Sequence, residues 1–167
     1  MNLYTYYNDP ESLTGFEDAR RLVPDLAYDF AQRTSGPYPA GEKAIARDAS
    51  CSYYYATVVI GGRFRLGEKS LANHPQYGAK YAERFFEGRW PEAEKAIASS
   101  SQASFDYACN SIGGPWPPGE DAIAEDKYNS YWYAVTLLKH RFEKGEPNIK
   151  KDNGLWTDYC RQFKIPT

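Results

Sequence analysis

The chain has 167 residues, of which 42% are hydrophobic and 25% are charged, and its net charge is −2. Such a length can enclose the core of one domain, and so small a net charge excludes a DNA mimic that works by bulk negative charge. Tyrosine is unusually frequent, with 15 copies beside 8 Phe and 4 Trp, so aromatic rings are expected to supply much of the buried area.

The first 35 residues are predicted to cap the rest of the chain. The opening MNLYTYYNDPESL has neither the basic start nor the apolar run of a signal peptide, so the chain is expected to be cytoplasmic and without a membrane anchor. Glu17, Ala19, Phe30 and Ala31 match the repeat described next if one residue is deleted before Gly36. Residues 1–35 therefore resemble a degenerate end repeat, as repeat proteins often carry.

From Gly36 onward the sequence repeats every 26 residues without a gap. The predicted copies span residues 36–61, 62–87, 88–113, 114–139 and 140–165. Each copy has an opening aromatic, a glutamate four residues later, a branched aliphatic residue, and a tyrosine followed by a small residue. In copy order, the aromatics are Tyr38, Phe64, Trp90, Trp116 and Phe142; the glutamates are Glu42, Glu68, Glu94, Glu120 and Glu146; the tyrosines are Tyr55, Tyr81, Tyr107, Tyr133 and Tyr159.

Each copy is predicted to form two helices. Segments such as GEKAIA and AEKAIA favour a helix of about two turns, with a glutamate near its positive N-terminal end. Polar pairs such as Arg47-Asp48 are then expected to end this short helix. A longer helix follows, as at residues 129–139, where Ser130, Tyr133 and Ala134 begin an apolar stripe. Gly61, Gly88 and Gly113 lie where left-handed helix ends are expected.

Neither helix can bury its apolar face alone, and stacked copies can. The predicted fold is therefore all-α, a single domain over 1–167 built as an α-solenoid of five two-helix repeats and a degenerate N-terminal one. YYYATVVIGG, residues 53–62, also has strand propensity, but its register with four helical copies favours helix.

The recurring residues are predicted to be structural. The five glutamates can accept hydrogen bonds from the preceding turn or from a recurring tyrosine, and neither catalytic residues nor a metal or cofactor site is predicted. His74 and His140 have no nucleophile at motif spacing. Cys51, Cys109 and Cys160 are odd in number and far apart, so reduced thiols are expected.

Function is predicted at positions that differ between copies. On the longer helices, the face opposite the Tyr-Ala stripe shares no chemistry from copy to copy. Exposed aromatic and arginine side chains are frequent binding hot spots. The predicted partner-binding residues on this face are Tyr54, Val58, Lys80, Arg84, Trp132 and Thr136.

The repeat resembles short helical repeats of uncharacterised proteins from tailed bacteriophages and prophages. The resemblance covers residues 36–165 and is fullest at Tyr81-Ala82 followed by Gly88-Arg89-Trp90-Pro91-Glu92, Glu94, Ile97 and Ala98. The chain departs from the pattern at Arg65-Leu66 and Glu143-Lys144, where Pro-Glu is expected. The resemblance implies a small phage protein acting in the cytoplasm of a bacterial host, and it implies no catalytic residue.

The sequence favours a non-enzymatic module that binds another protein through its variable face. The expected partner is a host enzyme or an antiviral defence complex such as CRISPR-Cas, which the chain would inhibit, and a homodimer is also open. One alternative is nucleic-acid binding or mimicry, although the mixed charges suit a protein better than a phosphate backbone. Another alternative is sequestration of a nucleotide in an aromatic groove, which is supported by the high aromatic content alone.

Overall fold

A computed structural model describes residues 17–166. Within that range the regular structure is helical and contains no strand, so the predicted all-α class is confirmed. None of the described helices is both long and apolar enough to cross a bilayer. Residues 1–16 of the predicted cap lie outside the described residues. The chain divides after Leu71 into two compact units.

The first unit consists of short helices around buried aliphatic and aromatic side chains. Residues 17–22 are helical, followed by α2 (Pro24–Arg33), α3 (Glu42–Ile45), α4 (Ala49–Tyr54), a π-helical turn (Tyr55–Ile60), a 3₁₀ turn (Arg65–Gly67) and the start of α5 (Glu68–Ala72). Ala27, Ala31 and Ile45 are fully buried. The stretch with strand propensity forms the end of α4 and the π turn, so it is helical.

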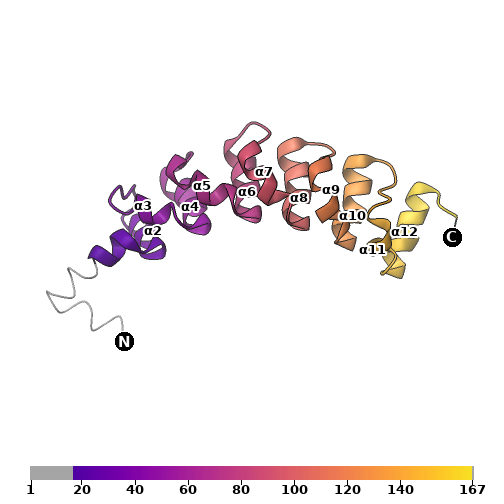
Figure 1. The fold of residues 1–167 in the computed structure, drawn as a ribbon, viewed down its shortest axis with the longest axis horizontal. Helices are drawn as coiled ribbons and strands as arrows, with labels where there is room; N and C mark the ends of the chain where they lie inside the picture. Colours follow the sequence, from indigo (N-terminus) through magenta and orange to yellow (C-terminus); the bar gives the residue numbers. More distant parts are fainter. Residues whose placement is uncertain (1–16, 167) are drawn as a thin grey trace, which may run out of the picture. The chain divides into compact units, whose positions relative to one another are not determined.

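The second unit alternates longer and shorter helices. Its elements are α6 (Pro75–Phe85), α7 (Pro91–Ile97), α8 (Ser101–Tyr107) with a π turn (Ala108–Ile112), a 3₁₀ turn (Pro117–Gly119), α9 (Glu120–Ala124), α10 (Lys127–Trp132) with a π turn (Tyr133–Leu138), α11 (Glu146–Ile149) and α12 (Asn153–Phe163). Within this unit α6, α8, α10 and α12 stand side by side in chain order (Figure 1). The shorter helices connect them.

Several longer helices begin at a side-chain cap. The carboxylate of Asp48 accepts a hydrogen bond from the backbone N–H of Cys51 at 2.8 Å, and Asp126 accepts from the N–H groups of Tyr128 and Asn129 at 2.9 Å each. Such caps satisfy N–H groups that have no partner within the helix. The polar breaks in the sequence are thus also helix starts, and α10 begins two residues before the predicted Asn129.

Of the three glycines predicted to end helices in the left-handed conformation, two are confirmed and one prediction is wrong. Gly61 (φ 66°) and Gly113 (φ 71°) end π turns in the left-handed conformation, as expected. Gly88 has φ 111° and lies three residues beyond the end of α6, so it is no left-handed cap. Lys139 (φ 59°) makes the same left-handed turn without being glycine.

Candidate interaction surface

The recurring tyrosine connects the parts of its own copy. The hydroxyl of Tyr107 donates to Glu94 Oε1 at 3.0 Å and accepts from the backbone N–H of Trp90 at 2.6 Å. The same two-bond arrangement occurs at Tyr55, Tyr133 and Tyr159, with Tyr-to-Glu distances of 2.9, 3.2 and 3.5 Å. The predicted bond between the recurring tyrosine and the glutamate of its own copy is therefore present.

Arginine binds the recurring glutamate in three copies, and in two of them the contact also lowers the pKa of the glutamate. Arg89 makes two bonds to the Glu94 carboxylate, at 2.7 and 2.6 Å, and Arg141 binds Glu146 in the same way at 2.7 and 2.9 Å. These guanidinium contacts lower the pKa of both carboxyls below the ordinary 4.5. A carboxylate bound on two sides by its own protein is poorly suited to acid–base work.

The recurring rings join one copy to the next. Tyr107 packs edge-on against Trp116 with centroids 4.9 Å apart, and Tyr55 against Phe64 and Tyr133 against Phe142 repeat this contact at 4.9 and 5.2 Å. The indole N–H of Trp116 is buried without a hydrogen-bond partner. The position thus uses the apolar area of the ring, which phenylalanine supplies equally well.

A recurring serine makes a further contact that sequence reasoning missed. Ser52, Ser104 and Ser130 are fully buried, and each hydroxyl donates to the carbonyl of the aliphatic residue seven positions earlier at 3.0 Å. Their signal in the sequence is the 26-residue spacing itself. It breaks at Gly78 and Trp156, which occupy the same place in the other copies.

The six predicted partner-binding residues are all exposed. They lie in three pairs, each one helical turn apart: Tyr54 and Val58 in the first unit, Lys80 and Arg84 on α6, and Trp132 and Thr136 on α10 with its π turn. Exposed fractions are 40% for Tyr54, 57% for Val58 and 49% for Trp132. α8 packs between α6 and α10, so the last two pairs are not direct neighbours.

Tyr128 belongs to the same surface and was not predicted. It lies one turn before Trp132 on α10 and is 53% exposed. The sequence signal that could have identified it is the i, i+4 spacing of Tyr128 and Trp132, which places both side chains on one helix face. Its copies in neighbouring repeats, Gln102 and Gly154, share no chemistry with it.

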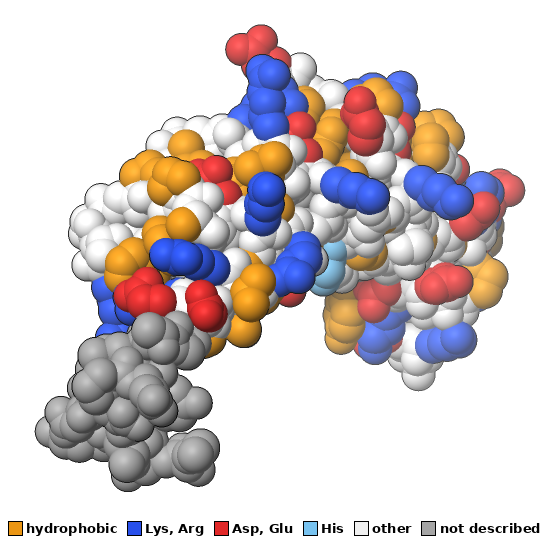
Figure 2. All heavy atoms as spheres, turned by 60° about the vertical axis from the view of Figure 1, so that its left-hand side comes forward, with side chains coloured by type: hydrophobic (Ala, Val, Ile, Leu, Met, Phe, Trp, Pro, Cys, Tyr) orange, Lys and Arg blue, Asp and Glu red, His pale blue; other side chains and the backbone are white. Residues whose placement is uncertain are grey.

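The molecular surface mixes both signs of charge. On the face shown in Figure 2, Lys and Arg side chains alternate with Asp and Glu, and hydrophobic side chains lie between them. A phosphate backbone requires a continuous basic track. This face is better matched to a partner with its own mixture of charged and apolar groups.

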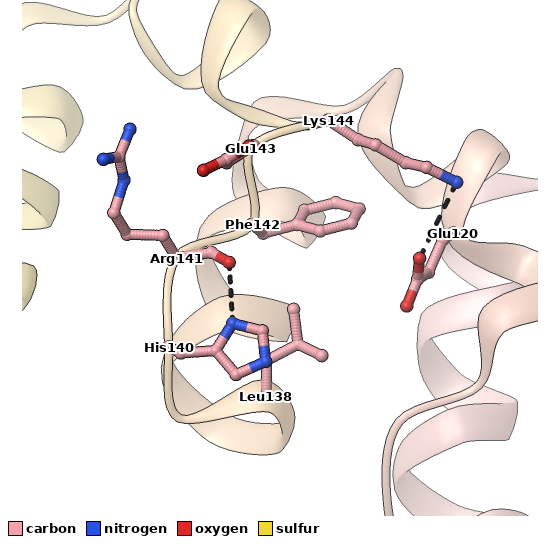
Figure 3. Close-up of a pocket in the computed structure, with 7 residues that line it drawn as sticks. All are labelled: Glu120, Leu138, His140, Arg141, Phe142, Glu143 and Lys144. Atoms are coloured by element: carbon pink, nitrogen blue, oxygen red, sulfur yellow. Dashed lines mark hydrogen bonds and ion pairs between the residues drawn. The ribbon is translucent and has the colours of Figure 1, made fainter.

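A hollow of about 340 Å³ opens beside the turn that precedes α11. Its lining residues are Glu120, Leu138, His140, Arg141, Phe142, Glu143 and Lys144 (Figure 3). Lys144 is paired with Asp121 at 2.8 Å and Glu120 at 3.7 Å. Because Lys144 and Arg141 both already bind carboxylates, the hollow offers few free charges to a ligand.

Two further side chains of catalytic type, His140 and Cys51, already have hydrogen-bond partners. His140 Nδ1 lies 2.8 Å from the carbonyl of Arg141 and therefore donates to it. The Cys51 thiol donates to Asp25 at 3.1 Å, and burial together with this carboxylate raises its pKa, so it is a poor nucleophile. Residues 17–166 contain no cluster of His, Cys, Asp and Glu that could hold a metal ion.

Comparison with protein-family models, curated proteins and solved structures found no match to this chain.

Proposed function

We propose that the chain is an α-solenoid of five 26-residue repeats, preceded by a degenerate sixth, and that it acts by binding another protein. Binding is assigned to the variable positions of the longer helices: Tyr54, Val58, Lys80, Arg84, Trp132 and Thr136. No catalytic step is part of this proposal.

The contrast between recurring and varying positions carries the proposal. The recurring tyrosines and branched aliphatics are fully buried, and the tyrosine hydroxyls join helix to turn within a copy. The six residues assigned to binding are exposed, and the chemistry at their positions changes from copy to copy. Packing requirements explain the first set and leave the second free to serve recognition.

The degenerate N-terminal copy is supported by its ring packing. Phe30 lies edge-on to Tyr38 with centroids 4.7 Å apart, as Tyr55 lies against Phe64 in the following copy. The interval along the chain is one residue shorter in the first pair. This matches the single deletion that aligns residues 17–35 with the repeat.

The kind of partner follows from the resemblance of residues 36–165 to phage repeats. We assign the chain to a host bacterial cytoplasm, where it would bind and inhibit a host protein such as a CRISPR-Cas defence complex. Two sets of exposed, large side chains, aromatic and arginine, supply the hot-spot chemistry for such an interface.

The test is an affinity pull-down from bacterial lysate read by mass spectrometry. The wild-type protein is compared with the triple variant Tyr54→Ala, Arg84→Ala, Trp132→Ala. A second triple variant, Lys43→Ala, Lys69→Ala, Lys95→Ala, changes three exposed residues that share one position on the shorter helices. Far-UV circular dichroism establishes that the variants retain their helices.

We expect one protein or complex to be enriched by the wild type and by the lysine variant, and lost with the aromatic–arginine variant. Equal capture by all three proteins would contradict the placement of the binding surface. No specific capture from any host lysate would contradict the proposed function.

A further inference from the structure

We propose that Trp132 and Asp106 form a recognition site for an arginine side chain of the protein partner. This inference rests on the proposed function, and it adds the chemistry of the group that the surface receives.

Trp132 is the aromatic residue on the longer helices that most clearly lacks a cation. Three other half-exposed or exposed rings on these helices carry a cation from the protein itself: Lys80 lies 5.9 Å from the Tyr77 ring centroid, Lys127 lies 4.8 Å from that of Tyr128, and Lys150 lies 4.6 Å from that of Trp156. Trp132 is 49% exposed and contacts only another ring, that of Tyr131 at 5.2 Å, among the ring and cation–π contacts of the described residues. Tryptophan offers the strongest cation–π surface of the side chains.

Asp106 supplies the matching carboxylate. It occupies the same repeat position on α8 as Trp132 does on α10. Its Oδ1 accepts a hydrogen bond from Gln102 at 2.8 Å, and no basic side chain within residues 17–166 lies within ion-pair distance of it. A half-buried carboxylate without a cation is better stabilised when a partner brings one.

Trp132 and Asp106 stand at equivalent positions of two neighbouring helices, α10 and α8. Asn129 on α10 donates to Ser101 on α8 at 3.0 Å, which joins the first turns of the helices. Packed helix axes lie about 8–10 Å apart, a gap that a bound side chain can bridge between an indole face and a carboxylate. On the other side of Trp132, Tyr131 packs against Tyr159 of α12 at 6.3 Å.

The charge of the surroundings and the shape of the ring select arginine. Residues 114–139 contain four acidic and two basic residues and carry a net charge of −2. A guanidinium stacks flat on an indole and donates two parallel hydrogen bonds to a carboxylate, whereas an ammonium is a point charge with a tight hydration shell. An arginine can therefore satisfy Trp132 and Asp106 together.

The test is selection of random 12-residue peptides displayed on phage against the immobilised full chain. We expect arginine to be enriched in the selected peptides relative to the input library. For a selected peptide, Trp132→Ala and Asp106→Asn should each weaken binding by roughly 3- to 30-fold. Replacing the peptide's arginine with neutral citrulline should weaken binding to the wild type and have little further effect on Asp106→Asn.

Asp158→Asn is the matched control, because Asp158 occupies the same repeat position on α12 as Asp106 does on α8 but is already paired with Arg161 at 2.9 Å. It should leave arginine-dependent binding unchanged. Peptides that depend on Trp132 but contain no basic residue would overturn the arginine site while leaving protein binding by this surface intact. Absence of selection, or selection indifferent to Trp132→Ala, would also overturn it, and the lysate pull-down then decides the proposed function separately.

Discussion

In four copies, those of Tyr55, Tyr107, Tyr133 and Tyr159, the hydroxyl of the recurring tyrosine bridges two other polar groups. It donates to a glutamate and accepts from a backbone N–H, while its ring is fully buried. An unpartnered buried polar group costs more than a typical hydrogen bond contributes. The hydroxyl therefore stabilises the fold chiefly by keeping two other polar groups satisfied.

Tyr107→Phe should remove this bridge without removing the ring. The Trp90 N–H then loses its partner, while Glu94 Oε1 keeps only its bond from Arg89, and we expect the free energy of unfolding to fall by about 1–3 kcal/mol. Urea denaturation followed by circular dichroism measures this difference. Tyr128→Phe, at a 53% exposed ring, is the control and should change stability by less than about 0.5 kcal/mol.

The same hydroxyls predict a loss of stability in alkali. Burial raises the pKa of Tyr55, Tyr107, Tyr133 and Tyr159 from 10.0 to about 12, with the neighbouring glutamates adding to the rise at each. A raised folded-state pKa contributes stability that is complete below pH 10 and is lost as the pH rises from 10 toward 12. A titration that follows tyrosinate absorbance and helicity together should show cooperative unfolding in this window. Independent ionisation of these tyrosines near pH 10 with full helicity would contradict the expectation.

Between elements, side-chain size is matched across the contact from one copy to the next. A Cβ on Gly119 would lie 2.8 Å from the Cβ of Ser104, and one on Gly145 would lie 2.5 Å from that of Ser130. In the copy where Ala93 replaces this glycine, the serine of the preceding copy is replaced by Gly78. A larger residue on one side of the contact is thus matched by a smaller one on the other side. The total side-chain volume at the contact changes little, as close-packed interiors require. In residues 140–165, Trp156 occupies the serine position.

Gly119→Ala should therefore be strongly destabilising. Its new methyl group would lie 2.4 Å from a ring carbon of Trp116, so the ring or the backbone has to move. We expect a loss of about 1–3 kcal/mol. Gly114→Ala is the control, since a Cβ there meets nothing within 4 Å. Comparison of the two thermal unfolding midpoints tests the prediction, and equal midpoints would contradict the close contact.

Across the whole molecule, periodicity predicted much of the structure because the same contacts recur. Identical spacing of aromatic, glutamate and tyrosine residues indicated which side chains are buried and that the glutamate accepts from the preceding turn or from a recurring tyrosine. The structure identifies the tyrosine of the same copy as the donor. It did not predict the π turns, which depend on backbone bonds five residues apart, such as that from the Gly61 N–H to the Ala56 carbonyl. Nor did it predict Lys139 in a left-handed conformation, because non-glycine residues rarely adopt it.

The candidate surface was predictable in a different way. Positions that vary between copies were identified from the sequence, and their side chains are exposed. Tyr128 escaped notice because each position was compared between copies rather than along one helix. Whether Asp106 has a basic partner depends on distances between side chains in the folded chain, and the spacing of residues in the sequence does not predict those distances.

The most direct test of the central claim is the deletion of one complete copy, residues 114–139, compared with deletion of its first half, residues 114–126. In a stack of repeats the longer deletion preserves the pattern, because Ser104 then meets Gly145 as Ser130 does in the full chain. We predict that it folds with the same helicity per residue and with lower stability. The shorter deletion, which leaves half a copy, should unfold the region around it. Measured by circular dichroism and thermal unfolding, loss of structure in the 26-residue deletion as severe as in the 13-residue one would contradict the repeat architecture.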